Sequence, residues 1–227
     1  QTVTVGGTRD GGVTHYRLDV VQDCGAYPKW GAFLPEFTRQ LATGVYDIAN
    51  LEFSAVSLAT NTAPTCAYRG AGRPEATAAI ERAMDLFAAE IGMDASEVRR
   101  TNLLAPEAFP YTTPTGTSMD SGDYEGALDR ALAAADYAGL RAEQQRRREA
   151  GDLVHMGIGV ATYVEITGFG GSEYGEVRLR SDGTVLASTG ATPIGTGHHT
   201  TWAMIVADRL GVPLDSIEVF HGDTEVI

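Results

Sequence analysis

The sequence predicts an α+β fold. Strands and helices follow one another along the chain, but the clearest strand pairs are hairpins, over residues 1–23 and 176–188. Helical periodicity is strong over residues 74–91, and further helices are expected over 123–150. Because hairpins join most of the strands, mixed sheets with helices packed against them are favoured over a doubly wound parallel sheet.

The N-terminal residues predict mostly strands. Thr2–Gly6 and Val13–Val21 flank the turn Arg9–Gly12, which indicates a hairpin. Leu51–Leu58 alternates apolar and polar side chains, as expected for a third strand. Residues 31–62 are otherwise mixed in character.

The clearest helix runs from Pro74 to Ile91. Its apolar side chains repeat at helical spacing, Pro74 suits a first turn, and Gly92 suits a C-terminal stop. Asp94 and Glu97 then form a pair like a capping box, which predicts a short helix through Arg100.

The second half begins with residues 105–122, where three prolines and several Thr and Ser residues predict a linker. Helices are expected over 123–135 and 136–150, and a second β unit is expected from Val154 onward. The later predicted elements are strands Glu176–Arg180 and Thr184–Ser188, a helix His199–Leu210 and a strand Ile217–Phe220.

Composition and charge exclude several classes of function. The 227 residues carry a formal net charge of −13, so no nucleic-acid partner is expected, and Arg146–Arg148 is interpreted as a solvated helix face. No apolar run reaches transmembrane length. Cys24 and Cys66 are too few for a disulfide framework, so we expect reduced, partly buried thiols and a cytoplasmic protein. Because the chain opens on Gln1 within a strand-like run, we expect an internal piece of a longer polypeptide.

The segment Ala67–Ala76 carries the strongest functional signal. Arg69 and Arg73 flank the residues Gly70, Ala71 and Gly72, and a helix is expected directly after them. Small residues let a backbone approach a ligand closely, and an arginine fork suits anions or oxo groups. A glycine-rich loop that only leads into a surface helix is an equally open alternative.

A second candidate loop, Thr189–Thr200, runs from a strand into the start of a helix. Gly195 and Gly197 remove side chains where a phosphate or pterin would lie, beside the free amides of the helix. A capped helix with a flexible preceding loop is the competing interpretation. His198 and His199 are adjacent and point different ways, so they predict polar cap residues, one of which could touch a ligand, rather than a metal pair.

Other catalytic patterns are weak. Glu173 and Glu176 are expected to face solvent, and His221 is expected in a turn at the end of a strand. The sequence contains no Ser/His/Asp set, no Gly-x-Ser-x-Gly elbow and no dinucleotide fingerprint after a strand.

Taken together, the two loops resemble the molybdenum hydroxylase family, which includes xanthine dehydrogenase, aldehyde oxidase and aerobic carbon monoxide dehydrogenase. The resemblance extends over nearly the whole chain, and the order and spacing of short motifs make it specific. Ala67–Arg73 is most similar to the molybdenum-binding large subunits of the form II carbon monoxide dehydrogenase group. The motifs are Asp23–Tyr27, Thr60–Pro64, Ala67–Ala76, Arg99–Leu103, Gly195–His198, Ala207–Gly211 and Gly222–Thr224.

The resemblance implies a molybdenum–molybdopterin cofactor, expected in its cytosine dinucleotide form, between two molybdopterin-binding domains. Residues 1–104 would be the C-terminal part of the first domain, 105–122 a linker, and 123–227 the N-terminal part of the second, so both domains would be incomplete. Dithiolene sulfurs would hold the metal, so no protein metal ligand is expected. The implied catalytic residues are Arg69, Gly70 and Ala71, and the implied cofactor contacts are Tyr68, Arg69, Gly72, Gly195, Thr196, Gly197 and His198.

The resemblance also implies hydroxylation of an electron-poor carbon, in an aldehyde or an N-heterocycle, with water as the oxygen source. Electrons would leave through iron–sulfur clusters and FAD on partners, namely a small iron–sulfur subunit and a medium FAD-binding subunit. The catalytic glutamate is expected beyond Ile227. The partner that reacts would be a small-molecule substrate.

Two departures from the family pattern bear on the substrate. Carbon monoxide oxidisers carry a copper-binding cysteine in the arginine loop, where this chain has Gly70, and Cys66 lies four residues earlier. Because copper(I) prefers soft sulfur ligands, carbon monoxide oxidation is the less favoured alternative. Thr196 stands where the pterin loop often has Gln, which would lose one amide contact. A non-catalytic anion-binding or assembly module is the remaining alternative.

Overall fold

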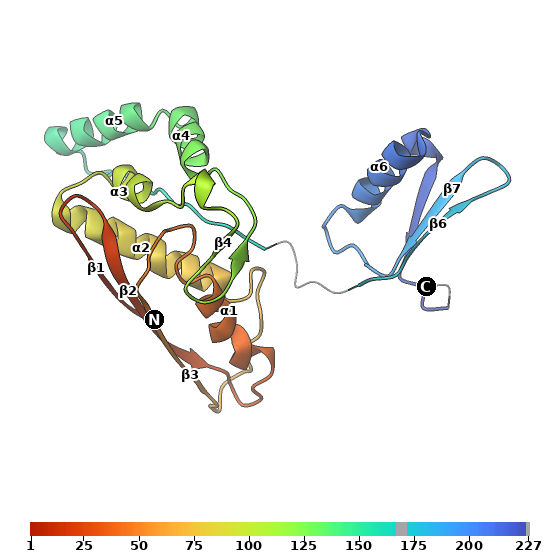
Figure 1. Cartoon of the computed structure of the whole chain (residues 1–227), viewed down its shortest axis with the longest axis horizontal. Helices are drawn as coiled ribbons and strands as arrows, with labels where there is room; N and C mark the ends of the chain where they lie inside the picture. The colour runs from red at the N-terminus through yellow and green to blue at the C-terminus, as the bar shows by residue number, and fades with distance from the viewer. Residues whose placement is uncertain (167–171, 226–227) are drawn as a thin grey trace. The chain divides into compact units, whose positions relative to one another are not determined.

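A computed structural model describes residues 1–166 and 172–225 of the chain (Figure 1). The chain divides into two compact units, Gln1–Glu165 and Ile166–Ile227. Both units combine helices with a sheet that has parallel and antiparallel neighbours, which confirms the predicted α+β class. Among the described residues, no helix is both long and apolar enough to cross a membrane.

The sheet of the first unit has the strand order β1-β2-β3. β1 (Thr2–Gly7) and β2 (Val13–Asp23) form the predicted hairpin, and β3 (Leu51–Leu58) runs parallel to β2. In the middle of β2, the buried Tyr16, Leu18 and Val20 alternate with less buried residues, because successive side chains point to opposite faces of a sheet. Tyr16 and Leu18, both fully buried, lie on this inner face.

The predicted helices cover that inner face. α2 (Arg73–Ile91) buries Ile80 and Met84, each 1% exposed, in the same hydrophobic cluster as Tyr16 and Leu18. The helix ends as predicted at Gly92, whose left-handed backbone lets its N–H donate to the carbonyl groups of the last turn. α3 (Ala95–Asn102) follows with Asp94 as its cap.

Two short helices, η1 (Trp30–Phe33) and α1 (Leu34–Gln40), lie in the stretch whose pattern was mixed. α1 has seven residues, too few for its apolar side chains to reveal a period. It packs against α2, the helix that begins within the segment Ala67–Ala76.

Residues 105–122, predicted as a linker, fold onto the first unit. They contain η2 (Pro106–Ala108) and the short hairpin of β4 (Tyr111–Thr112) with β5 (Ser118–Met119). The hydroxyl groups of Thr115 and Thr117 donate to the carbonyl of Gln40 at 3.0 and 2.7 Å. The predicted boundaries of the two cofactor-binding domains stay a prediction.

α4 (Tyr124–Ala134) and α5 (Tyr137–Ala150) lie within one residue of their predicted positions. The expectation of β structure from Val154 is wrong for residues 154–166, which contain no strand. Individual contacts hold this segment in place instead. One of them is the hydrogen bond that the Thr162 amide donates to Glu81 at 3.1 Å.

The second unit contains the predicted hairpin of β6 (Gly175–Leu179) and β7 (Val185–Thr189). α6 (His198–Leu210) and the short η3 (Leu214–Ser216) then lead to β8 (Ile217–His221), which pairs with β7 in parallel. β7, α6 and β8 therefore form a crossover connection between two parallel strands. The start of α6 and the end of β8 both belong to this unit.

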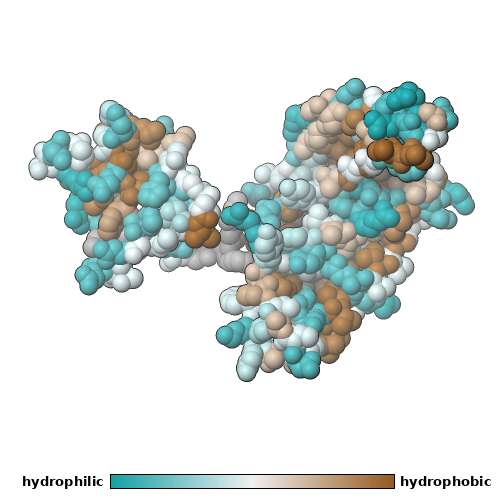
Figure 2. Space-filling view, turned by 180° about the vertical axis from the view of Figure 1, so that it is seen from behind, coloured by the Kyte–Doolittle hydropathy of each residue, from teal (hydrophilic) through white to brown (hydrophobic). Residues whose placement is uncertain are grey.

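The two cysteines differ in exposure. Cys24 is buried and Cys66 is exposed, and both are free thiols, so the expectation of two partly buried thiols is wrong. On the face shown in Figure 2, hydrophobic patches interrupt the hydrophilic surface of each unit. Large exposed apolar side chains of the first unit include Tyr27, Trp30, Phe33 and Tyr68.

Candidate cofactor-binding loops

The arginine loop of the first unit is built from three consecutive residues with positive φ. Gly70, Ala71 and Gly72 have φ values of 100°, 44° and 87°. The Ala71 amide donates to the Tyr68 carbonyl at 2.8 Å, which closes the turn. Left-handed backbone is unfavourable for residues with a side chain, so the sequence needs glycine on both sides of Ala71.

Gly72 is fixed against α1. A Cβ atom on Gly72 would lie 2.4 Å from the Leu34 carbonyl oxygen and 2.9 Å from the Thr38 nitrogen. The buried Thr38 hydroxyl also donates to the Gly72 carbonyl at 2.9 Å. The helix that sequence patterns missed therefore supports the loop that they identified.

Gly70 faces the ring of Pro74. A Cβ atom on Gly70 would lie 2.5 Å from Pro74 Cγ and 2.6 Å from Pro74 Cδ, closer than real Cβ contacts allow. Together with the φ of 100°, this contact means that a side chain at position 70 would strain the backbone and force the proline ring or the turn to shift.

Two motifs of the family resemblance meet just before this loop. Asp23 accepts hydrogen bonds from the Thr60 hydroxyl at 2.7 Å and the Gly25 amide at 2.9 Å. These bonds lower the pKa of the Asp23 carboxyl, the Thr60 bond having the largest effect. A Cβ atom on Gly25 would lie 2.3 Å from the Ala63 carbonyl oxygen, so the two segments touch backbone to backbone. They hold in place the stretch that leads to the loop.

The predicted ligand-facing side chains of this loop are accessible. Tyr68 is 86% exposed, and Arg69 is also exposed. Arg73 behaves differently, because its side chain is only 13% exposed and forms an ion pair with Glu165. Glu165 also lies 3.8 Å from a Cβ placed on Gly70. No sequence pattern indicated Glu165, which is the last residue of the first unit and meets the loop only in the folded structure.

A buried charge network anchors the segment that carries Glu165. Arg99 is fully buried, and its Nε donates to Glu81 at 2.8 Å. The Tyr46 hydroxyl donates to the other oxygen of Glu81 at 2.5 Å, and burial together with the Glu81 charge raises the pKa of Tyr46 well above its usual range. Thr162 then binds Glu81 through its amide, three residues before Glu165.

The second candidate loop is open. Gly195 and Gly197 have φ values of 94° and 74°, and a Cβ atom on either would meet nothing within 4 Å. Gly197 is the N-cap of α6 and provides no side-chain hydrogen bond to the first amides of the helix. Thr196 is exposed between them. An uncapped helix start beside two bare glycines fits the anionic or polar edge of a cofactor.

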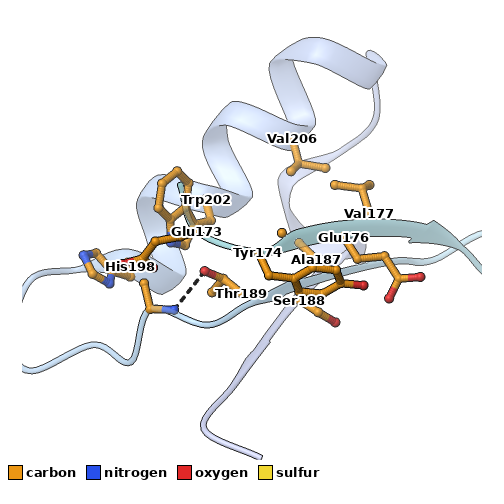
Figure 3. A pocket seen from close by; sticks show the side chains of 12 residues that line it. Glu173, Tyr174, Glu176, Val177, Ala187, Ser188, Thr189, His198, Trp202 and Val206 are labelled. Atoms are coloured by element: carbon orange, nitrogen blue, oxygen red, sulfur yellow. Dashed lines mark hydrogen bonds between the residues drawn. The ribbon is translucent and has the colours of Figure 1, made fainter. Parts of the chain in front are cut away.

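A cavity of about 460 Å³ lies between α6 and the β6–β7 hairpin (Figure 3). Figure 3 shows His198 and Trp202 of α6 at one end of the cavity and Val177 and Val206 toward the other. The ring centroids of His198 and Trp202 are 5.9 Å apart. Among the described residues, neither His198 Nδ1 nor Trp202 Nε1 has a hydrogen-bond partner, although both atoms are buried. These groups leave polar atoms available to a ligand.

The expectations for Glu173, Glu176 and His221 have different outcomes. Glu173 is exposed as expected, but Glu176 is half-buried and both line the cavity. His221 ends β8, and its Nε2 lies 3.0 Å from Nε2 of His199.

Within the described ranges, no group of three or more His, Cys, Asp or Glu side chains is placed to hold a metal ion.

The chain is similar to known molybdopterin-binding proteins over most of its length. Two family models, each described as a molybdopterin cofactor-binding domain, match residues 1–103 and 130–227. The carbon monoxide dehydrogenase large chain of Hydrogenophaga pseudoflava is 38% identical over 233 residues, covering 96% of this chain and 29% of that protein.

Two solved structures extend the similarity. Reconstituted CO dehydrogenase from Oligotropha carboxidovorans matches with a TM-score of 0.85 and 32% identity, over 98% of this chain and 30% of that chain. Quinoline 2-oxidoreductase from Pseudomonas putida 86 matches with a TM-score of 0.89 and 28% identity, over 97% of this chain and 30% of that chain. The chain thus spans about 30% of the length of these relatives.

The two matched domains, which together cover most of the chain, define a molybdopterin cofactor-binding protein. More specifically, the chain belongs to the molybdenum hydroxylase family, with the sequence of its large, molybdenum-binding subunits. The resemblance inferred from short motifs is confirmed.

Proposed function

We propose that this chain supplies two cofactor-contacting loops of an oxidoreductase that hydroxylates an electron-poor carbon, in an aldehyde or an N-heterocycle, with water as the oxygen source. Membership of the molybdenum hydroxylase family supports the reaction class. Similarity to quinoline 2-oxidoreductase supports the N-heterocycle. When bound, the molybdenum cofactor supplies the oxygen transfer and accepts two electrons.

The observation that carries the choice of substrate class is the backbone at Gly70. Carbon monoxide oxidation by a copper–molybdenum centre needs a cysteine thiolate at this position, according to the family resemblance. Gly70 has no thiolate, and its left-handed φ and the Pro74 ring would strain any side chain at this position. The similarity to carbon monoxide dehydrogenases supports the family, while position 70 favours carbon hydroxylation.

The residues divide into two roles in this proposal. Arg69, exposed on its turn, holds negative charge that develops on substrate or oxo groups, while Gly70 and Ala71 bring bare backbone close to the reacting atoms. Cofactor contacts come from Tyr68, Arg69 and Gly72 in the first unit and from Gly195, Thr196, Gly197 and His198 in the second.

We also propose features of the whole enzyme that the family resemblance implies. The cofactor carries a cytosine dinucleotide, and electrons pass to iron–sulfur clusters and FAD on a small and a medium partner subunit. The enzyme acts in the cytoplasm. Purification of the intact complex, followed by cofactor extraction, identifies each of these components.

Metal analysis and turnover of the complete complex test the substrate class. We expect molybdenum without stoichiometric copper, oxidation of an aldehyde or N-heterocycle, and no oxidation of carbon monoxide. A copper-to-molybdenum ratio near one with carbon monoxide oxidation would establish the alternative. A complex without molybdenum, whose visible absorption does not respond to substrate, would establish a non-catalytic anion-binding or assembly module.

Replacement of Arg69 tests the role of the loop. In the complete enzyme, Arg69→Ala is expected to lower turnover by at least about a hundredfold, as loss of one charge-stabilising donor does in other enzymes, or to lower molybdenum content. Arg146→Ala, on the exposed face of α5, is the control and leaves both unchanged. Normal molybdenum content together with a normal rate in Arg69→Ala would contradict the assignment.

A further inference from the structure

Two histidines of the second unit face each other although 22 residues separate them. His199 lies in the first turn of α6, and His221 is the last residue of β8. Their Nε2 atoms are 3.0 Å apart, their ring centroids are 4.8 Å apart, and the rings are inclined by 65°. Neither the spacing of the two residues nor the adjacent pair His198–His199 predicts this arrangement.

The two distances describe a bent arrangement. In a straight N–H···N hydrogen bond of the same length, the ring centroids would be about 5.3 Å apart, since each nitrogen lies just over 1 Å from its ring centre. If the two rings are arranged symmetrically, a line can be drawn from each ring centroid through its Nε2 atom. With the centroids 4.8 Å apart and the nitrogens 3.0 Å apart, the two lines meet about 2 Å beyond the nitrogens. That length is an imidazole–metal bond. We propose that His199 and His221 form a binding site for a divalent transition-metal ion.

Among these ions, nickel(II) and copper(II) would require the smallest movement of the two rings. With bonds of about 2.0–2.1 Å, nitrogens this close subtend an angle of about 95° at the metal, as adjacent positions of a square or an octahedron do. A tetrahedral zinc ion would hold the two nitrogens about 3.3 Å apart. Imidazole is a ligand that copper and nickel both accept, and copper(II) stands highest in the usual order of affinity.

Rigid elements position the two rings. β8 pairs in parallel with β7, with His221 opposite Thr189. α6 starts abruptly at the left-handed Gly197, two residues before His199, and packs on β8. Because a helix and a paired strand hold the ligands, little conformational freedom is lost on binding.

The surroundings allow a cation but limit its affinity. His199 is exposed, so water completes the coordination, and residues 166–227 contain eight Asp and Glu against three Arg. Nδ1 of His221 is buried with no hydrogen-bond partner among the described residues, so no such contact fixes its tautomer. The site is distinct from molybdenum, which the family resemblance assigns to pterin sulfurs.

Calorimetric titration of the full chain with nickel(II) tests the site. Nickel is the probe because, unlike copper(II), it does not oxidise the exposed thiol of Cys66. We expect one nickel per chain at this site, and at least about a tenfold loss of affinity in both His199→Gln and His221→Gln. His155→Gln, which removes an exposed histidine of the first unit, is the control and binds nickel as the parent does.

His198→Gln separates this pair from the adjacent one. It removes the sequence neighbour of His199 but keeps the ring of His221, so nickel binding is expected to persist. Loss of binding in His198→Gln with retention in His221→Gln would overturn the proposal, as would unchanged affinity in either His199→Gln or His221→Gln. Because His199 is exposed on the first turn, circular dichroism of His199→Gln is expected to match the parent.

Discussion

Glycines with similar backbone angles have different reasons for being glycine in this protein. Gly72 and Gly116 have φ values of 87° and 88°. A Cβ on Gly116 would meet nothing within 4 Å, whereas a Cβ on Gly72 would lie 2.4 Å from a backbone oxygen of α1. At Gly116 only the backbone angle matters, while at Gly72 close packing of the arginine loop against α1 matters as well.

This matched pair gives a prediction. Gly116→Ala is expected to lower the free energy of unfolding by about 1–2 kcal/mol, the usual strain of a left-handed alanine. Gly72→Ala adds the overlap with α1 and is expected to lower it by about 1–3 kcal/mol more. Urea unfolding of both variants measures the difference, and equal losses would contradict the close approach.

Single residues also mark the limit of prediction from sequence. The arginine loop was found because Gly, Ala, Gly and Arg stand together in the sequence. Glu165 was missed because it reaches Arg73 through tertiary packing, with Thr162 held by the buried Glu81. The meeting of His199 and His221 was missed for the same reason, since parallel pairing of β7 and β8 sets it.

At the scale of elements, periodic or alternating apolar side chains were a reliable guide, whereas the extended character of residues 154–166 was not. α2 was predicted to within one residue because four apolar side chains repeat along it. Residues 154–166 were expected to begin a β unit, but a strand requires a partner, and this segment has none in the described structure. Partner choice depends on distant residues, so local composition cannot distinguish a strand from an extended connection.

Asp94 joins two helices through a carboxylate. It accepts from the Ser96 amide at the start of α3 at 2.8 Å, and from the Tyr137 hydroxyl of α5 at 3.0 Å. Burial alone would raise the pKa of Asp94, but the bonds from Ser96 and Tyr137, with the Arg141 charge, outweigh it and lower the pKa.

The direction of this shift predicts a dependence on pH. A lowered pKa in the folded state means that the carboxylate stabilises the fold above the unfolded pKa of about 3.9 and that this stabilisation is lost as pH falls through the folded pKa. Asp94→Asn keeps a cap but does not titrate, so its stability should fall less steeply below pH 4. Urea midpoints of both proteins from pH 5 to pH 2.5 test this, and parallel curves would disprove the role of Asp94.

At the scale of the molecule, each unit has its own buried residues. The main cluster of the first unit includes Met84, which is 1% exposed, whereas Val185 and Ala187 are buried in the second. This separation follows from hydrophobic burial, because each sheet is covered by helices of its own unit.

We therefore expect core substitutions to act within one unit. Met84→Ala should destabilise the first unit by about 2–5 kcal/mol, while Met84→Leu, which conserves volume, should destabilise it by less than about 1.5 kcal/mol. Amide hydrogen exchange should show faster exchange in α2 of the alanine variant and unchanged exchange in β7. Equal acceleration in both places would show that the two units unfold together.

The contact between Gly70 and Pro74 also sets a condition for protein engineers. A single codon change that introduces cysteine at position 70 would place its Cβ against the proline ring, so the turn would open before the thiol could reach a metal. Pro74 starts the helix that follows, so replacing it as well would remove the residue that favours the first turn there. A cysteine at position 70 would thus need at least one compensating replacement nearby before this loop could present a thiolate without strain.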